Sequence, residues 1–134
     1  MAKAVLDTNI LVSALIWRGA PYHCLLSAQA GFFELIISEP ILDELSSVLA
    51  GKFRIEDEQV KEFISLVKRT GHLVRIVDRI RLVADDPSDD KVVEAAAAAK
   101  ADFIVTGDHH LLKLGKYKNV RIIKAAAFLH MMLE

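Results

Sequence analysis

Residues 4–12, which read AVLDTNILV, predict a short buried strand that ends in a carboxylate and passes directly into a helix. A continuous apolar run is typical of a central strand in a parallel sheet, where both faces are covered. Thr8 or Asn9 is predicted to cap the helix that follows. Ligands of open α/β sheets bind beyond the carboxyl ends of the strands, so we expect Asp7 to lie in a functional site.

Length and charge place the chain among globular proteins of one domain. It has 134 residues, of which 53% are hydrophobic, and its formal net charge is −1. This length is sufficient for a single domain with a buried core, spanning residues 1–134. The nearly neutral charge argues against a protein that coats nucleic acid through its overall charge, although it allows local basic patches.

Hydropathy and cysteine content predict a cytoplasmic protein that associates with itself or with a partner. No apolar run approaches the roughly 18 residues that span a membrane, and the first residues enter the first strand without room for a cleaved signal. The single cysteine, Cys24, excludes an intrachain disulfide and fits a reducing compartment. The mean hydropathy of +0.32 predicts apolar surface that is buried in a homodimer, a higher homo-oligomer or a complex.

Periodicity and turn residues divide the rest of the chain into alternating helices and strands. Helices are predicted at 10–17, 21–30, between Ser38 and Gly51, and at 57–69, 91–100, 109–114 and 125–133; strands are predicted at 33–37, 73–77, within 101–108 and at 120–123. Such alternation predicts an α/β fold with a mostly parallel sheet and right-handed crossovers.

Several acidic residues are predicted to gather at one edge of this sheet. Asp7 and Asp108 each follow an apolar strand, and Asp89 and Asp90 open the alanine-rich helix. Glu44 borders the apolar stripe of its own helix, at about 100° per residue. A doubly wound topology can bring all of these positions together at the carboxyl ends of the strands.

Gathered carboxylates require a counter-charge. Carboxylates a few ångströms apart repel each other and raise each other's pKa, and a divalent cation removes this conflict. Oxygen ligands without a matched set of cysteines or histidines favour Mg²⁺ or Mn²⁺ over Zn²⁺. Such a site can hold one or two metal ions, activate water and stabilise the charge that develops on a phosphodiester.

Each acid also has an interpretation without catalysis. Asp89 and Asp90 fall in a first helical turn, where each negative charge stabilises the helix dipole by about 0.3–1 kcal/mol. Glu44 fits a surface position beside the solvated Asp43, and Asp108 fits an ordinary turn. Asp7 is harder to explain in this way, because a carboxylate at the end of an apolar strand needs a partner. The prediction of a site therefore depends on the combination.

Four blocks of the chain, taken in order, resemble one known family. They are residues 5–13 (VLDTNILVS), 38–45 (SEPILDEL), 86–90 (DPSDD) and 101–108 (ADFIVTGD), the last followed by two leucines at 111 and 112. Each block alone is weakly specific. Together and at this spacing they resemble the PIN domain, most of all its branch of toxin components of toxin–antitoxin pairs, over essentially the whole chain.

The resemblance implies a fold, an activity and partners. The PIN domain is a compact three-layer α/β/α sandwich with a mostly parallel central sheet, and its usual activity is metal-dependent cleavage of RNA. A Mg²⁺ or Mn²⁺ ion, an RNA substrate, a protein antitoxin and a homodimeric state are therefore expected for this chain.

The resemblance also assigns site residues. Asp7, Glu44, Asp89 and Asp108 become the catalytic and metal-binding acids, and Asp90 is the alternative metal ligand at the third position. Asp89 is preferred there because it completes the motif of residues 86–89. Two polar residues, Asn9 and Thr106, are expected to support these acids.

The densest basic stretch follows Asp108. Lys113, Lys116 and Lys118 are candidates for contacts with RNA phosphates, although a solvated loop is the more common explanation for such a stretch. His109 and His110 match no metal-ligand spacing and are interpreted as exposed loop residues.

Three functions compete on this basis. The first is a metal-dependent ribonuclease, and the second is a non-catalytic PIN-like module that binds RNA or a protein. The third is a phosphatase or phosphotransferase with Asp7 as nucleophile. It ranks last because the Asp-x-Asp signature of such enzymes is absent, position 9 being Asn9.

Overall fold

The computed structural model describes residues 1–80 and 87–133, without the side chains of residues 87–89. The strands are β1 (Lys3–Leu6), β2 (Glu34–Ile37), β3 (His72–Leu73), β4 (Phe103–Val105), β5 (Lys116–Tyr117) and β6 (Val120–Ile123). The helices are α1 (Thr8–Ile16), α2 (Gly19–Gln29), α3 (Glu39–Gly51), α4 (Asp57–Thr70), α5 (Pro87–Ala99), α6 (His109–Leu114) and α7 (Ala125–Met132).

One mixed sheet organises the chain, with the strand order β3-β2-β1-β4-β6-β5. All neighbouring pairs are parallel except β5 and β6, which are antiparallel. β1 is central, and its Val5 pairs with Ile36 of β2 on one side and Ile104 of β4 on the other. The mostly parallel α/β sheet predicted from the sequence is therefore confirmed.

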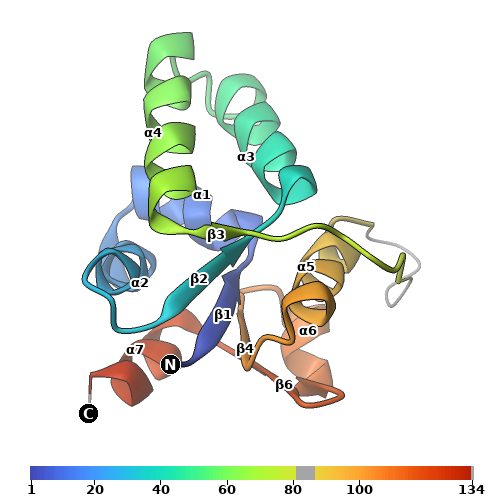
Figure 1. Ribbon diagram of the computed structural model, residues 1–134. Coiled ribbons are helices and arrows are strands. Elements are labelled where there is room, and N and C mark those ends of the chain that lie inside the picture. The colour runs from blue at the N-terminus through green and yellow to red at the C-terminus, as the bar shows by residue number, and fades with distance from the viewer. Residues whose placement is uncertain (81–86, 134) are drawn as a thin grey trace.

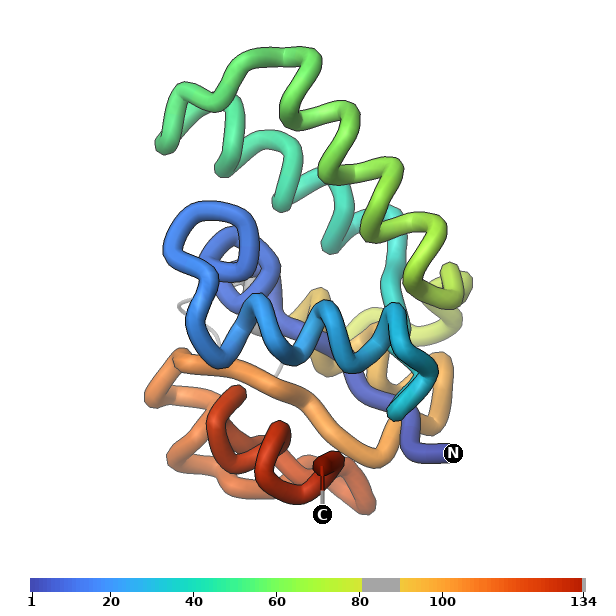
Figure 2. The backbone as a smooth tube through the Cα atoms, turned by 90° about the vertical axis from the view of Figure 1, so that its left-hand side faces the viewer, coloured from blue at the N-terminus to red at the C-terminus, as the bar shows by residue number. Residues whose placement is uncertain are grey.

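Helices cover both faces of the sheet and complete three layers. In Figure 1, α2 and α7 lie on one side of the strands, whereas α5 and α6 lie on the other side. α5 packs directly against β1, β2 and β4. α3 and α4 contact each other and project together beyond the remaining helices, as Figure 2 shows from the side. This is the expected α/β/α sandwich.

Burial explains why the first strand reads as an unbroken apolar run. Ala4, Val5 and Leu6 are at most 1% exposed, because helices cover the sheet on both faces. α5 contributes a buried segment of its own, since residues 92–96 are all buried. The carboxyl end of β1 is therefore surrounded by protein, and any side chain placed there is withdrawn from solvent.

Two predicted elements differ from the structure. The strand expected at 73–77 is reduced to β3, His72–Leu73. Its partner β2 ends at Ile37, whose carbonyl accepts a last hydrogen bond from the Val74 N–H at 2.8 Å, so the chain beyond has no strand to pair with. The basic stretch at 116–119 was expected without a strand, yet Lys116 and Tyr117 form β5. A tight turn brings them back onto β6 as an edge strand, where lysines are well tolerated.

The start of α1 also differs from the prediction. Asp7, and not Thr8 or Asn9, occupies the N-cap position, and its side chain makes no capping hydrogen bond. The Asp7 carbonyl instead accepts from the N–H groups of Ile10 and Leu11. The Asp7 carboxylate is thus free of a capping role.

No helix within the described residues is long and apolar enough to cross a membrane.

Candidate metal site at the carboxyl edge of the sheet

Asp7 lies where two central parallel strands end together. Leu6 pairs with Val105, and the Asp7 N–H extends this ladder by donating to the Val105 carbonyl at 2.9 Å. The next residues on the two strands, Asp7 and Thr106, are consequently neighbours. Asp7 is only 5% exposed, as expected for a residue at the covered end of β1.

Thr106 links the two acids that follow β1 and β4. Its buried hydroxyl donates to Asp7 Oδ2 at 2.7 Å and accepts the Asp108 N–H at 3.0 Å. Because the hydroxyl proton points toward Asp7, the bond favours the ionised form of that carboxylate. The structure therefore brings Thr106 to Asp7, in an arrangement suited to the supporting role expected from the resemblance.

The environment of Asp7 opposes its negative charge despite this hydrogen bond. Burial is the main cause, and the nearby charges of Glu44 and Asp108 add to it, so that the pKa of Asp7 rises from 3.8 to about 6. Hydrogen bonds from Thr106 and from the Thr8 backbone lower the pKa in part. Three of the predicted acids are therefore close enough to interact electrostatically.

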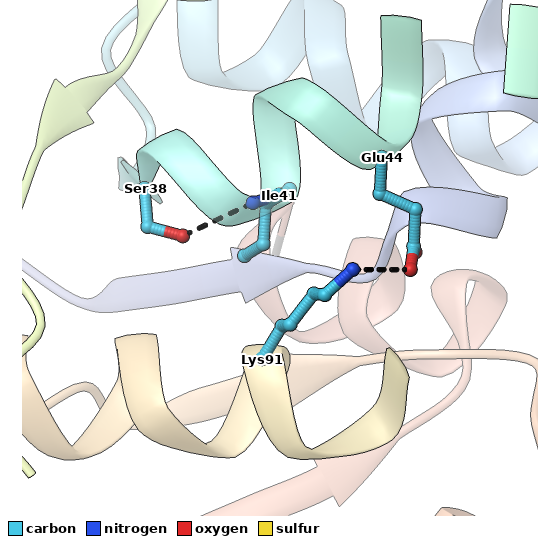
Figure 3. A network of polar contacts seen from close by, with 4 residues as sticks. All are labelled: Ser38, Ile41, Glu44 and Lys91. Carbon is cyan, nitrogen blue, oxygen red and sulfur yellow. Dashed lines mark hydrogen bonds and ion pairs between the residues drawn. The ribbon is translucent and has the colours of Figure 1, made fainter. Parts of the chain in front are cut away.

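Glu44 reaches the site from α3. Ser38 caps this helix, since its Oγ accepts the Ile41 N–H at 3.4 Å, and Ile41 and Leu45 anchor the buried face of the helix. The Glu44 side chain is 18% exposed and pairs with Lys91 of α5 at 3.1 Å (Figure 3). Asp43 is exposed, as predicted from the helical period.

Asp108 combines a structural contact with a position beside Asp7. Its Oδ1 accepts the N–H groups of His110 and Leu111, at 2.8 and 3.2 Å, and so caps α6. The interpretation of Asp108 as a turn residue is thus correct for this oxygen. Its negative charge also lies close enough to Asp7 to disfavour the ionised form of that carboxylate.

Two acids of the third motif open α5. Asp89 lies in the first turn of α5, but its side chain is outside the described residues, and so are Asp85 and Asp86. Asp90 is half-buried in the same turn. The choice between Asp89 and Asp90 as third ligand stays a prediction.

The remaining predicted residues are exposed, and within the described part of the chain no hydrogen bond or ion pair joins them to Asp7. Asn9 is exposed in the first turn of α1. Lys113 is exposed in the last turn of α6, and Lys116 and Lys118 are exposed around β5, which pairs with the amino half of β6. Because β6 runs parallel to β4, this hairpin lies toward the amino ends of the parallel strands, whereas Asp7 lies at their carboxyl ends.

The donor chemistry at this edge fits a divalent metal ion. Asp7, Glu44 and Asp108 supply oxygen atoms only, and their mutual effect on the pKa of Asp7 is one that a cation reverses. Among the described side chains, no three acids, histidines or cysteines surround one point as closely as metal ligands do. In particular, Glu44 is turned toward Lys91.

Two charged residues of α5 with tertiary contacts were not expected from the sequence. Lys91 pairs with Glu44, and Glu94 is a 6% exposed acid of α5 whose Oε2 accepts the Ile80 N–H at 2.9 Å. A signal for Glu94 was available, because a single charge inside the apolar run 92–96 must be paired when that run is buried. Lys91 has no comparable signal, since a lysine after two aspartates is ordinary for a solvated helix.

One groove lies away from the acids. It has a volume of about 930 Å³, and Leu15 and Ile16 at the end of α1 and Phe63 and Leu66 of α4 contribute its apolar lining. No acid of the cluster lines it. Trp17, which directly follows α1, is 73% exposed.

The fold and the site together define a class: an α/β domain that gathers carboxylates at the carboxyl edge of a parallel sheet. A model of the PIN domain family matches residues 3–110, which include all the acids described above. The chain belongs to the PIN domain family. No curated protein matches it.

Two solved structures share this fold. One is from the crystal structure of VapBC2 from Rickettsia felis bound to a DNA fragment from their promoter; it is 18% identical, with a TM-score of 0.61, over 90% of this chain and 96% of that chain. The other is from VapBC-1 of nontypeable Haemophilus influenzae; it is 16% identical, with a TM-score of 0.65, over 92% of this chain and 98% of that chain. At these identities the likeness shows the fold alone.

Proposed function

We propose that this chain is a metal-dependent endoribonuclease that hydrolyses RNA phosphodiester bonds, and that it is the toxin component of a toxin–antitoxin pair. The observation that supports this most is the buried Asp7, whose pKa is raised to about 6 by burial and by the nearby Glu44 and Asp108. A buried acid that is perturbed by neighbouring acids is typical of catalytic sites. Membership of the PIN domain family and the similarity to VapBC structures support the nuclease and toxin assignment.

The acids at the carboxyl edge would hold a Mg²⁺ or Mn²⁺ ion. We assign this role to Asp7, Glu44 and Asp108, with Asp89, or Asp90 in its place, as the fourth acid. When bound, such an ion lowers the pKa of water and stabilises negative charge on a phosphodiester.

The chain itself positions these acids. Thr106 fixes one Asp7 oxygen through its donated hydrogen bond, and the α6 N–H groups fix one Asp108 oxygen. Both carboxylates are thereby oriented before any ligand arrives, which reduces the entropy that binding costs.

Basic residues would bind the RNA strand away from the cleavage point. Lys113, Lys116 and Lys118 are exposed, and their charges attract phosphates. These lysines lie toward the amino ends of the parallel strands. An RNA strand bound at Asp7 must therefore follow α6 to reach them. We therefore assign these lysines a role in affinity and not in catalysis.

We further propose that residues 1–134 form one domain that binds a protein antitoxin and forms a homodimer. The similarity to VapBC structures supports the antitoxin. Exposed apolar side chains such as Trp17 and Phe32, which are 73% and 54% exposed, support burial against other protein chains.

A second candidate is a non-catalytic PIN-like module that binds RNA or a protein. Two observations favour it. Glu44 forms an ion pair with Lys91. Among the described side chains, no three acids, histidines or cysteines are close enough together to bind one metal ion. The two functions differ in a measurable way, because only the nuclease needs ionised acids and a metal ion.

Cleavage of labelled single-stranded RNA tests the proposal. Wild type, Asp7→Asn and Glu44→Gln are compared in Mg²⁺, in Mn²⁺ and in EDTA, with Asp43→Asn as a matched control one residue from Glu44. We expect metal-dependent cleavage by wild type and Asp43→Asn, and a loss of about 100-fold or more in the two site variants, as for other groups that stabilise charge in the transition state.

Two outcomes would reject the nuclease. RNA binding without cleavage in every metal would favour the binding module. Equal cleavage by wild type and Asp7→Asn would show that the activity belongs to a contaminant or to another site.

A further inference from the structure

The ion pair between Lys91 and Glu44 joins two helices across the acidic cluster. Lys91 lies on α5 and Glu44 on α3, and Nζ lies 3.1 Å from Oε2. Figure 3 shows the lysine side chain extending from α5 to meet the glutamate below α3. The ammonium group thus contacts an acid that the proposed function assigns to the metal ion.

This pair differs from the other lysine ion pair of the described residues. Lys61 and Asp57 pair within one turn of α4, with side chains 68% and 80% exposed. The side chains of Lys91 and Glu44 are 35% and 18% exposed, so solvent and salt screen their attraction less. Lys91 therefore places a positive charge where it acts on the site.

Lys91 contacts one acid of the cluster, Glu44. Glu44 lies close enough to Asp7 to disfavour its ionisation. An ammonium group on Glu44 offsets part of the repulsion among the acids. The same ammonium repels a divalent cation and occupies an oxygen that the cation requires.

We propose that Lys91 is a built-in counter-ion of the acidic cluster, which holds Glu44 in the metal-free protein and competes with the divalent metal ion for it. The inference rests on the metal site of the proposed function. It makes Lys91 a positioning residue: metal binding must displace the lysine from Glu44, so the lysine lowers the affinity for the metal. A purely structural ion pair would leave this affinity unchanged.

Binding of Mn²⁺ to Lys91 variants tests the proposal without any RNA. The protein is stripped with EDTA and dialysed, and Mn²⁺ binding is measured by electron paramagnetic resonance and by calorimetry. We expect Lys91→Gln to bind Mn²⁺ roughly tenfold more tightly, the effect of removing one unit charge about 6 Å from a divalent ion in a solvated site. Lys91→Arg keeps the charge and should stay near the wild-type Kd.

Lys61→Gln is the matched control, because it removes a lysine from an ion pair of similar length outside the cluster. We expect its Mn²⁺ affinity to equal that of wild type. Thermal unfolding gives a second measurement: Lys91→Gln should lower Tm more than Lys61→Gln in EDTA, and saturating Mn²⁺ should reduce this difference.

Several outcomes would overturn the inference. A folded Lys91→Gln that binds Mn²⁺ as wild type does, or more weakly, excludes competition, and absence of Mn²⁺ binding in every variant does so as well. If Lys91→Gln does not fold, Lys91→Met, which keeps an unbranched side chain without the ammonium group, is measured against the same expectation. If neither variant folds, the ion pair is structural and the inference is wrong.

The nuclease proposal stands or falls separately. Tighter Mn²⁺ binding by Lys91→Gln together with no RNA cleavage by wild type would reject only the nuclease. Metal-dependent cleavage with an unchanged Kd in Lys91→Gln would reject only the counter-ion.

Discussion

Asp7 shows how a single residue can be unfavourable for stability and useful for function. It is 5% exposed, and burial is the main cause that raises its pKa from 3.8 to about 6. At neutral pH the folded protein must therefore hold a charge that the unfolded chain accommodates more easily. A site that disfavours charge in this way binds a cation more readily, because the ion removes the penalty.

The first prediction concerns pH and the stability of the metal-free protein. The folded state binds a proton at Asp7 up to about pH 6, whereas the unfolded chain releases it near 3.8. Between these values the native state holds more protons, so stability falls as pH rises and the full penalty is present above about pH 6. Asp7→Asn removes the penalty and should stabilise the protein by up to about 3 kcal/mol at pH 7.

Urea unfolding in EDTA between about pH 4 and pH 7 measures this difference. The exposed Asp43→Asn is the control and should follow wild type. An Asp7→Asn protein that is less stable than wild type at pH 7, or a difference that does not grow with pH, would contradict the prediction.

Helix α5 connects the site to the chain that follows β3. It packs against three central strands, and its residues 92–96 are buried. Glu94 belongs to this buried run and accepts the Ile80 N–H at 2.9 Å. A buried carboxylate is stabilised when it accepts a hydrogen bond from a backbone N–H group that has no partner in a strand. Glu94 therefore anchors the end of the segment that leaves the sheet after Leu73.

The second prediction is that Glu94→Ala destabilises the protein by about 1–3 kcal/mol, because the Ile80 N–H loses its partner in a part-buried position. Hydrogen exchange at the Ile80 amide should accelerate by more than the loss of global unfolding free energy explains. Glu62→Ala, an exposed position of α4, should change stability by less than about 0.5 kcal/mol. Unchanged exchange at Ile80 would show that Glu94 does not anchor the segment.

On the scale of the whole molecule, several large apolar side chains are exposed. Trp17 and Leu133 are 73% and 59% exposed, and the groove of about 930 Å³ between α1 and α4 carries apolar side chains. Exposed apolar surface is removed from water when chains associate, which contributes about 25 cal/mol per Å².

The third prediction is that the purified chain forms a homodimer. Light scattering after size exclusion should give twice the mass of the 14.9 kDa chain at micromolar concentration. A mass of one chain at all concentrations tested would contradict the prediction. In that case, we would expect a different protein partner to cover the exposed apolar side chains.

Short-range patterns were sufficient for most of the architecture. The run that ends in Asp7, the helix between Ser38 and Gly51 and the apolar stripe of α3 depend on residues a few positions apart, so the sequence predicted them correctly. The order of strands and helices then implied a parallel sheet with Asp7 at its carboxyl edge. It could not give the length of β3, because that length depends on where β2 ends.

The contacts within the site were decided by tertiary structure. Thr106 and Asp7 are 99 positions apart, and Lys91 and Glu44 are 47 positions apart. Which side chains meet at such separations depends on the register of β1 with β4 and on the rotation of α3 against α5. These follow from packing of the whole core and not from any local pattern. The carboxylate of Asp7 was therefore predicted from the sequence. Burial as the main cause of its raised pKa, the geometry of its hydrogen bond with Thr106 and the contact between Glu44 and Lys91 were not.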